Sequence, residues 1–182
     1  KDWEVVNFRD FLSNKDFKVG KLKQNEFKEK GKYPIIDQGQ SLIAGYSDDT
    51  DKVYQGDLPV IIFGDHTRIF KYIDFPFICG ADGTKVLLPK EGINPKFFYY
   101  ILLSIEIPSR GYNRHYHLLK DKKFQLPSLD EQNKIASILS MIEGVISQSD
   151  VKTETLQSLF KTMLNQLMTG RIRVKNLDIE VN

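Results

Sequence analysis

The sequence contains little that would support disulfide, zinc-thiolate or membrane chemistry. Cys79 is the only cysteine among 182 residues, which excludes an internal disulfide and a cysteine-based zinc site and favours a reducing compartment. No run of about 18 uninterrupted apolar residues predicts a membrane-spanning helix. The first residues, KDWEVVNF, lack the basic-then-apolar pattern of a secretory signal. We therefore expect a cytoplasmic protein that makes no membrane contact.

Composition is sufficient for a folded interior. Hydrophobic residues make up 41% of the chain and aromatic residues 12%, so disorder is not expected. The net charge is only +2, but five basic and two acidic residues lie between Ile105 and Lys123. This local excess favours a positioned contact surface over a nonspecific polycation.

Short strands separated by turns are predicted for the first two-thirds of the chain. Four β-branched and aromatic runs are bounded by Gly, Pro and Asp: KYPIID, LPVIIFG, RIFKYIDFPFIC and TKVLLP. The segment INPKFFYYILLS breaks this pattern and predicts a core helix with Pro95 near its start. Its apolar side chains are Phe97, Phe98, Ile101 and Leu102.

The pattern changes after Pro127, where Ser128 or Asp130 can cap a helix. Apolar residues then recur at alternating steps of four and three, which predicts an amphipathic helix of the coiled-coil type. We expect its seam to pack against a partner helix through Ile135, Leu139, Ile142, Ile146, Leu156, Phe160, Met163 and Leu167. A second apolar row contains Ile138, Val145 and Leu159.

The polar stretch SQSDVKTET inside this region has two interpretations. Ser149 and Asp150 could form the loop of a helical hairpin. Alternatively the helix continues, and Ser149 and Thr153 occupy polar seam positions that fix register. The heptad count stays in phase across the stretch, which favours one long helix, with Gly170 as its C-terminal cap.

The segment RGYNRHYHLLKD, from Arg110 to Asp121, concentrates side chains that bind nucleic acid. Arg and Asn make bidentate contacts to guanine and adenine, and tyrosines and other basic groups reach phosphates. His115 and His117 would face one side of a strand, but no third metal ligand lies nearby in sequence. The alternative to a nucleic-acid contact is a solvated turn leading into an edge strand.

A second polar segment, FGDHTRIFKY, places three hydrogen-bonding side chains, His66, Thr67 and Arg68, after a Gly–Asp turn. They could contact base edges or phosphates. Equally, Asp65 and Thr67 could only satisfy the local backbone of a hairpin tip.

Other candidate motifs favour structural interpretations. CGADGTK matches neither the P-loop nor the dinucleotide fingerprint and is typical of a tight turn. Cys79 lies in an apolar run, where a free cysteine acts as a small buried hydrophobe and not as a nucleophile. Acid-x-Lys strings such as EFK and DKK arise easily by chance in a chain that is 27% charged.

Five stretches together resemble one half of the DNA-specificity subunit of type I restriction–modification systems. They are W-x-x-V at the start, GKYPIIDQGQ…GY, IIFGDHTRIFKYIDFPFICGADGTKVL, GYNRHYHLLKDKKFQLPSLDEQNKIASIL, and a helix ending in LMTGR. The resemblance covers nearly the whole chain, and the LPSLDEQ junction is its most specific element.

The resemblance implies an α+β fold: a β-rich target recognition domain of mixed α/β structure over residues 1–129, a long spacer and dimerisation helix over 130–170, and a tail over 171–182. In the family, two such units in tandem pack their helices antiparallel, and each recognition domain reads one half of a split target in double-stranded DNA. This chain holds one unit, so it is a half-sized subunit that dimerises through its helix or a piece of a longer subunit.

The resemblance also implies an adaptor without catalytic residues, metal site or cofactor of its own. Methyltransferase subunits, which bind S-adenosylmethionine, and in some systems restriction subunits are the expected partners. A metal-dependent restriction endonuclease and a helix-mediated interaction module without sequence readout are the alternatives.

From side-chain chemistry we expect a DNA-facing set: His66, Thr67, Arg68, Arg110, Tyr112, Asn113, Arg114, His115, Tyr116 and Lys120. Within it, Arg68, Asn113 and Arg114 are the expected base readers. Tyr112, Tyr116 and Lys120 are the expected phosphate contacts.

Overall fold

The computed structural model describes residues 3–15, 17, 19–81, 83–108, 111 and 113–176. Contacts divide the chain into two compact units, Lys1–Ser137 and Ile138–Asn182. No helix within the described ranges is both long and apolar enough to cross a membrane.

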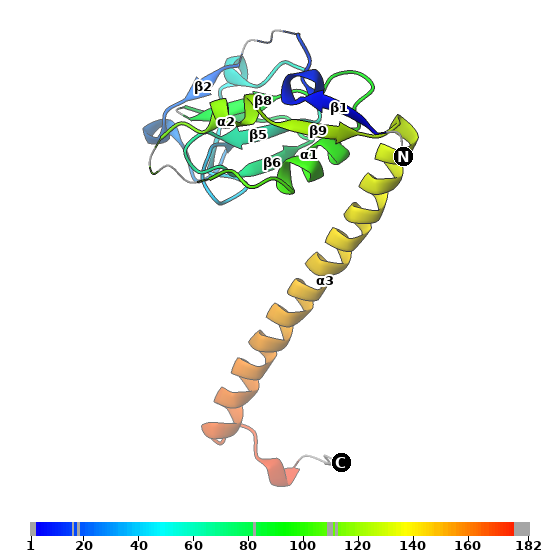
Figure 1. Ribbon diagram of the computed structural model, residues 1–182. Helices are drawn as coiled ribbons and strands as arrows, with labels where there is room; N and C mark the ends of the chain where they lie inside the picture. Colours follow the sequence, from blue (N-terminus) through cyan, green and yellow to red (C-terminus); the bar gives the residue numbers. More distant parts are fainter. Residues whose placement is uncertain are drawn as a thin grey trace. The chain divides into compact units, whose positions relative to one another are not determined.

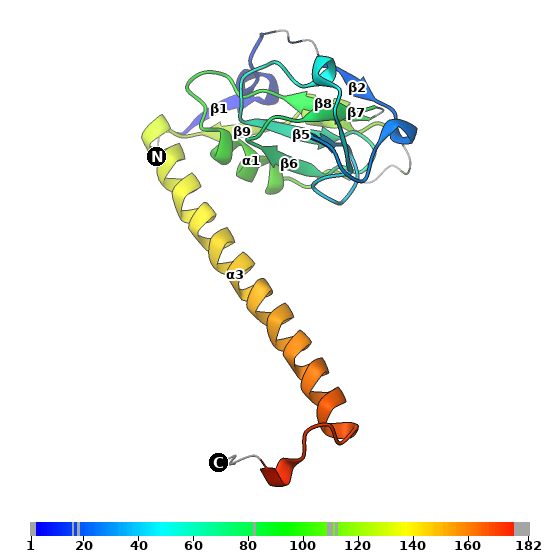
Figure 2. The same cartoon turned by 180° about the vertical axis from the view of Figure 1, so that it is seen from behind.

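Three sheets form the first unit (Figures 1 and 2). One is the antiparallel pair β1 (Glu4–Asn7) and β9 (Lys123–Leu126). The second is a mixed sheet in the order β2 (Lys21–Leu22), β7 (Ile78–Gly80), β3 (Tyr33–Ile36) and β4 (Gly45–Ser47). The third is an antiparallel sheet in the order β6 (Phe70–Ile73), β5 (Val60–Gly64) and β8 (Thr84–Leu87).

Within the described residues, the chain also forms α-helices and short 3-10 helices. The α-helices are α1 (Pro95–Leu103), α2 (Tyr116–Lys120) and α3 (Leu129–Met168). The short 3-10 helices are η1 (Phe8–Phe11), η2 (Gln24–Glu26), η3 (Thr50–Lys52) and η4 (Val174–Asn176).

Strand β5 is buried on both faces. Its side chains alternate, so Ile61 and Phe63 enter one apolar core while Val60 and Ile62 enter another. All four side chains have no exposed surface. A strand covered on both sides requires a continuous apolar run, and VIIF provides it.

Helix α1 closes the first core. The side chain of Asn94 accepts a hydrogen bond from the backbone N–H of Phe97 at 2.9 Å, and Pro95 lies in the first turn, as the sequence predicted. The rings of Phe98 and Phe11 stack at 5.2 Å with an interplanar angle of 10°. The core helix and all four predicted strand runs are therefore confirmed.

Two expectations about local structure are wrong. The alternation at His115–Leu118 does not form a strand, because Tyr116–Lys120 forms helix α2; the strand expected after this segment is β9. His115 and His117 consequently do not share a strand face: His115 is fully buried and His117 is exposed. Strands β1, β2 and β4 were not predicted.

Helix α3 is one continuous helix of 40 residues. This confirms the prediction of one long helix, which was based on the unbroken heptad phase. Inside the polar stretch, the Thr153 hydroxyl donates to the Ser149 carbonyl at 2.9 Å, so the helix carries this polar side chain without a break. Gly170 follows the helix with a φ of +67°, the left-handed conformation expected of a glycine cap.

The first turns of α3 belong to the first unit. The side chain of Gln132 is 2% exposed. Its amide donates to the Pro127 carbonyl at 3.0 Å and accepts from the Asn94 backbone N–H at 2.9 Å. Ala136 is buried and Ile135 packs against the core. Our prediction that Ile135 belongs to the open seam is therefore wrong.

Within the second unit, large apolar side chains of α3 lie open to solvent. Those at least half exposed are Ile138, Met141, Val145, Ile146, Val151, Leu156, Leu159, Phe160 and Met168. Ile142 and Leu167, both on the predicted seam, are 49% and 36% exposed. Leu139 and Met163 are half-buried.

Removing the Phe98 ring should destabilise the first unit strongly. We expect Phe98→Ala to lower the free energy of unfolding by about 3–5 kcal/mol, because it leaves a cavity beside Phe11. Chemical denaturation followed by circular dichroism measures this loss. The matched control is Leu103→Ala on the same helix, where the side chain is 49% exposed and the change should stay within about 0.5 kcal/mol. Equal losses in both variants would contradict this description of the core.

Candidate nucleic-acid interface

The turn Gly64–Arg68 begins where the buried strand β5 ends. The Arg68 backbone N–H donates to the Gly64 carbonyl at 2.7 Å and closes the turn. Gly64 is required sterically, because a Cβ there would overlap the Thr67 hydroxyl. Arg68 adopts a φ of 65°, which is uncommon for a residue other than glycine. The turn is therefore held in a specific conformation.

Asp65 joins this turn to the second polar segment predicted from sequence. Its carboxylate is 2% exposed and accepts from the backbone N–H groups of His115 and Tyr116 at 2.8 and 2.7 Å. The His115 ring Nδ1 lies 2.9 Å from the Asp65 carbonyl oxygen, which can only accept, so Nδ1 carries the proton. Two segments about 50 residues apart in sequence are thereby fixed together.

Two further loops are attached to the same turn. The Thr67 hydroxyl donates to the Gln38 carbonyl at 2.6 Å, and the Gln38 side-chain oxygen accepts from the His66 backbone N–H at 3.2 Å. The Asp65 backbone N–H donates to the Gly83 carbonyl at 2.6 Å. Gly83 has a φ of +66°, and a Cβ there would overlap the Gln38 side chain. Gly83, which belongs to the CGADGTK turn predicted from sequence, is thus part of this site.

Lys71 on β6 holds the Asp37–Ser41 loop from inside. Its side chain is only 4% exposed, and its ammonium donates to the carbonyls of Asp37 and Ser41 at 2.8 and 2.6 Å. Burial lowers the pKa of Lys71, and the nearby Asp37 carboxylate acts in the opposite direction. A buried cation is thus used to fix the main chain of a loop in which Gln40 and Ser41 are exposed.

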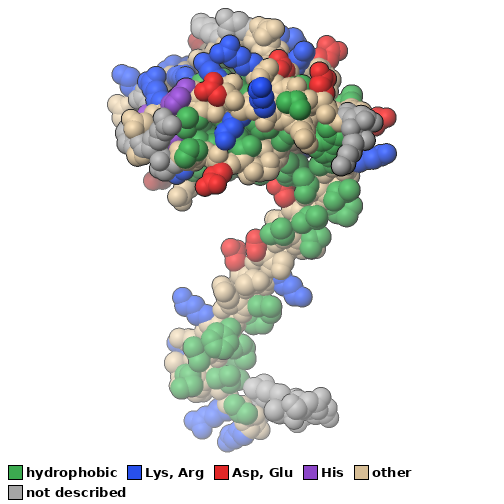
Figure 3. All heavy atoms as spheres, viewed as in Figure 1, with side chains coloured by type: hydrophobic (Ala, Val, Ile, Leu, Met, Phe, Trp, Pro, Cys, Tyr) green, Lys and Arg blue, Asp and Glu red, His purple; other side chains and the backbone are tan. Residues whose placement is uncertain are grey.

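The expected DNA-facing residues occupy different environments. Asn113, Arg114 and Lys120 are exposed, and His66 and Tyr116 are half-buried. Arg110 and Tyr112 lie outside the described residues. On the face drawn in Figure 3, histidine side chains lie beside a group of Lys and Arg side chains.

Three assignments change because the side chains have partners within the protein. His115 is fully buried, so its ring is absent from the exposed surface and we withdraw it from the DNA-facing set. The Thr67 hydroxyl is used by the Gln38 carbonyl, and Arg68 Nη1 donates to the Ile107 carbonyl at 2.9 Å. These contacts occupy donors that we expected to meet DNA. They also differ from the hairpin-tip alternative, because Thr67 and Asp65 bind backbone groups that are 29 to 51 residues away in sequence and not only the local backbone.

Sequence reasoning missed Gln38 and Lys71. The signal for Gln38 was its position in DQGQ, a polar loop directly after a predicted strand and inside one of the family-like stretches. Lys71 alternates with apolar residues in RIFKYI and had no signal of its own, since its carbonyl partners are about 30 residues away in sequence.

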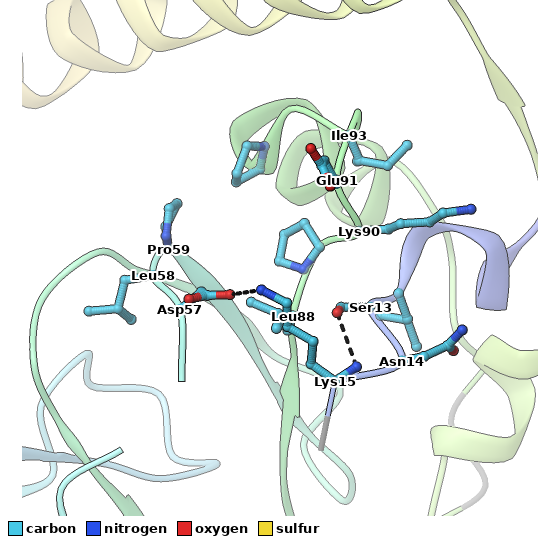
Figure 4. A pocket seen from close by; sticks show the side chains of 13 residues that line it. Ser13, Asn14, Lys15, Asp57, Leu58, Pro59, Leu88, Lys90, Glu91 and Ile93 are labelled. Carbon is cyan, nitrogen blue, oxygen red and sulfur yellow. Dashed lines mark hydrogen bonds and ion pairs between the residues drawn. The ribbon is translucent and has the colours of Figure 1, made fainter. Parts of the chain in front are cut away.

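Other places in the first unit offer poorer sites. A cavity of about 640 Å³ lies beside Leu88 and Pro59, and two of its charged lining residues, Lys15 and Asp57, pair with each other at 2.6 Å (Figure 4). Burial raises the pKa of the Cys79 thiol to about 12, so it is not an activated nucleophile. Among the residues that the structure describes, no group of three or more His, Cys, Asp or Glu could hold a metal ion.

Loss of the Asp65 carboxylate should release the segment around His115. We expect Asp65→Ala to leave the half-buried Tyr116 N–H without its acceptor, at a cost of about 1–3 kcal/mol, while the His115 N–H keeps only the Asp65 main-chain carbonyl as its acceptor. Hydrogen exchange should accelerate at residues 113–118. Asp65→Asn keeps an acceptor oxygen and should restore most of the protection, and Asp121→Ala, at an exposed position after α2, should change neither quantity. Unchanged exchange in Asp65→Ala would contradict this role.

Comparisons with known proteins agree with this architecture. Residues 1–167 match the family model for the type I restriction modification DNA specificity domain. The type I restriction enzyme MjaVIII specificity subunit of Methanocaldococcus jannaschii is 28% identical over 207 residues, covering 98% of this chain and 48% of that protein. The EcoR124I/EcoR124II specificity subunit of Escherichia coli is 28% identical over 148 residues, covering 74% of this chain and 35% of that protein.

Solved structures share the fold at lower identity. The type I restriction–modification S subunit from M. genitalium superimposes with a TM-score of 0.64 at 18% identity, covering 91% of this chain and 45% of that one. The HsdS subunit from Thermoanaerobacter tengcongensis gives 0.54 at 16% identity, covering 90% and 44%. The chain spans about half the length of these structures and half or less of the curated relatives. On the match over residues 1–167, the chain belongs to the family of type I restriction modification DNA specificity domains.

Proposed function

We propose that this chain is a sequence-specific DNA-binding unit that reads one half of a split target in double-stranded DNA. The observation that carries the proposal is the Asp65 carboxylate, which fixes the main chain at His115 and Tyr116. Asn113 and Arg114 directly precede this anchor and are exposed. Side chains that read bases must be presented at defined positions, and a buried main-chain anchor provides that.

The proposed division of roles follows from side-chain chemistry. Arg114 pairs with guanine through O6 and N7, and Asn113 pairs with adenine through N6 and N7. Lys120 and the Tyr116 hydroxyl bind phosphates, which set register without reading sequence. His66, Arg110 and Tyr112 remain proposed DNA contacts from their chemistry and their place in the sequence.

We further propose that the helix after residue 130 serves as spacer and dimerisation element, beside a recognition domain over residues 1–129 and a tail over 171–182. The exposed apolar side chains of α3 within the second unit support this proposal, because a helix in water does not keep such a face uncovered. A second copy packed antiparallel would cover the seam. The row Ile138, Val145 and Leu159 would contact methyltransferase subunits.

In this proposal the chain is a cytoplasmic adaptor that catalyses no reaction itself. Methyltransferase subunits supply the S-adenosylmethionine chemistry, and restriction subunits join in systems that cut DNA. Sequencing the methylated bases of a host with and without the gene tests this directly. We expect one split methylated motif to be present in the host that carries the gene and absent from the host that lacks it. Cleavage of DNA by the chain alone with a divalent metal would favour the restriction endonuclease. An unchanged methylome would favour the interaction module without sequence readout.

Arg114→Ala should remove one base contact without unfolding the chain. We expect specific binding to weaken by about 1–3 kcal/mol and the preference at one base pair to relax. Binding selection from a random duplex library, followed by sequencing, measures both effects. Arg173→Ala, an exposed arginine in the second unit, is the matched control. An unchanged selected motif in folded Arg114→Ala would refute the assignment.

Phe160→Glu should break the proposed dimer, because it places a carboxylate in the apolar seam at a side chain that is 69% exposed. Light scattering should give twice the mass of one chain for the wild type and the mass of one chain for the variant. Leu139→Glu should act in the same way. Ser158→Glu adds the same charge away from the seam and should leave the dimer intact. A dimer of unchanged mass in both seam variants would disprove the helix contact.

A further inference from the structure

Two ammonium groups lie against one tyrosine ring in the first unit. Lys120, at the end of α2, has its Nζ 5.0 Å from the Tyr116 ring centroid. Lys85, on β8, has its Nζ 5.7 Å from the same centroid. These residues come from separate elements, so the fold and not local sequence gathers the two charges. The electron-rich ring partly offsets their repulsion.

Arg9 adds a third positive charge. It lies in η1, beside Phe8, whose ring meets the Tyr116 ring edge-to-face at 6.1 Å. Burial raises the pKa of the Tyr116 hydroxyl, the charge of Arg9 acts to lower it, and the charge of Asp65 acts to raise it. At neutral pH the hydroxyl therefore keeps its proton and can donate a hydrogen bond among the cations.

Two carboxylates linked to this cluster, that of Asp10 next to Arg9 in sequence and that of Asp65 bonded to the Tyr116 main chain, have partners within the protein. Asp10 accepts from the backbone N–H of Asn7 at 2.7 Å, and the buried Asp65 accepts from the N–H groups of His115 and Tyr116. Within the described part of the chain, no ion pair neutralises Arg9, Lys85 or Lys120. An anion held between the cations would relieve their mutual repulsion.

We propose that Arg9, Lys85, Lys120 and the Tyr116 hydroxyl form a binding site for one phosphate group of the DNA backbone. This inference rests on the proposed DNA-binding function and adds Arg9 and Lys85 to the contact surface. The site is tied through Tyr116 to the same Asp65 carboxylate that fixes His115, next to Arg114 and Asn113. A phosphate held there sets the position of the duplex relative to the base-reading side chains.

Salt dependence tests the site, because each phosphate contact contributes about 0.9 to the slope of log K against log salt. The full chain is titrated with a selected target duplex and with an unrelated duplex by fluorescence anisotropy. We expect Lys85→Gln and Lys120→Gln each to weaken binding to both duplexes equally and to lower the slope by about 0.9. Raising salt fourfold should then weaken wild-type binding about 3-fold more than variant binding.

Lys96→Gln is the matched control. Lys96 also lies over a tyrosine ring, that of Tyr72 at 4.2 Å, but on helix α1, and its variant should keep the wild-type slope. Thermal melting verifies that every variant is folded. If Lys85→Gln and Lys120→Gln both keep the salt slope of the wild type, and the wild type still prefers the target duplex, the phosphate site is overturned and the proposed function is not. A wild type that does not prefer the target duplex would instead overturn the proposed function.

Duplexes carrying one neutral methylphosphonate at successive positions then locate the contact. At one position the methylphosphonate should weaken binding by the wild type. The same methylphosphonate should weaken binding by Lys85→Gln only slightly, since that variant already lacks the interaction with this phosphate. Independent losses at every position would count against a single shared phosphate.

Discussion

The burial of strand β5 on both faces is the constraint on which the recognition domain depends. Because alternate side chains of VIIF fill two separate cores, the strand cannot shift by one residue without exchanging the contents of both. Its end at Gly64 is therefore fixed, and so is the start of the Gly64–Arg68 turn. That turn anchors the loop at Gln38, the turn at Gly83 and the segment at His115. A rigid interior thus determines where the polar loops are placed.

The strands and the long helix could be predicted because their signals are local. β-branched runs and an unbroken heptad phase lie within the segments that form them. Helix α2 was missed because the alternation of His115 and His117 with Tyr116 and Leu118 imitates a strand. The conformation there depends on Asp65, about 50 residues earlier in sequence. Ile135 was misassigned for a related reason: periodicity identifies an apolar face but not the surface that covers it, and the first turns of α3 pack on the domain core.

The site was predicted in part. Side-chain chemistry singled out both polar segments, and the structure brings them together through Asp65. Side-chain chemistry alone could not separate the side chains that face solvent from those that hold the loops in place. Thr67 and Arg68 carry donors suited to nucleic acid, but those donors meet carbonyls of Gln38 and Ile107. Burial and distance decide between the two uses, and neither is encoded in the identity of a single residue.

The bracing side chains share one property: they bind main-chain atoms of neighbouring loops. Asp65 accepts from backbone N–H groups, and Thr67, Arg68 and Lys71 donate to backbone carbonyls. Because these contacts use main-chain atoms of the loops, they do not depend on which side chains the loops carry. Asn113, Arg114 or Gln40 can be exchanged for other residues without removing any of these contacts. The surface of the domain can therefore diverge by single substitutions while its frame is inherited unchanged.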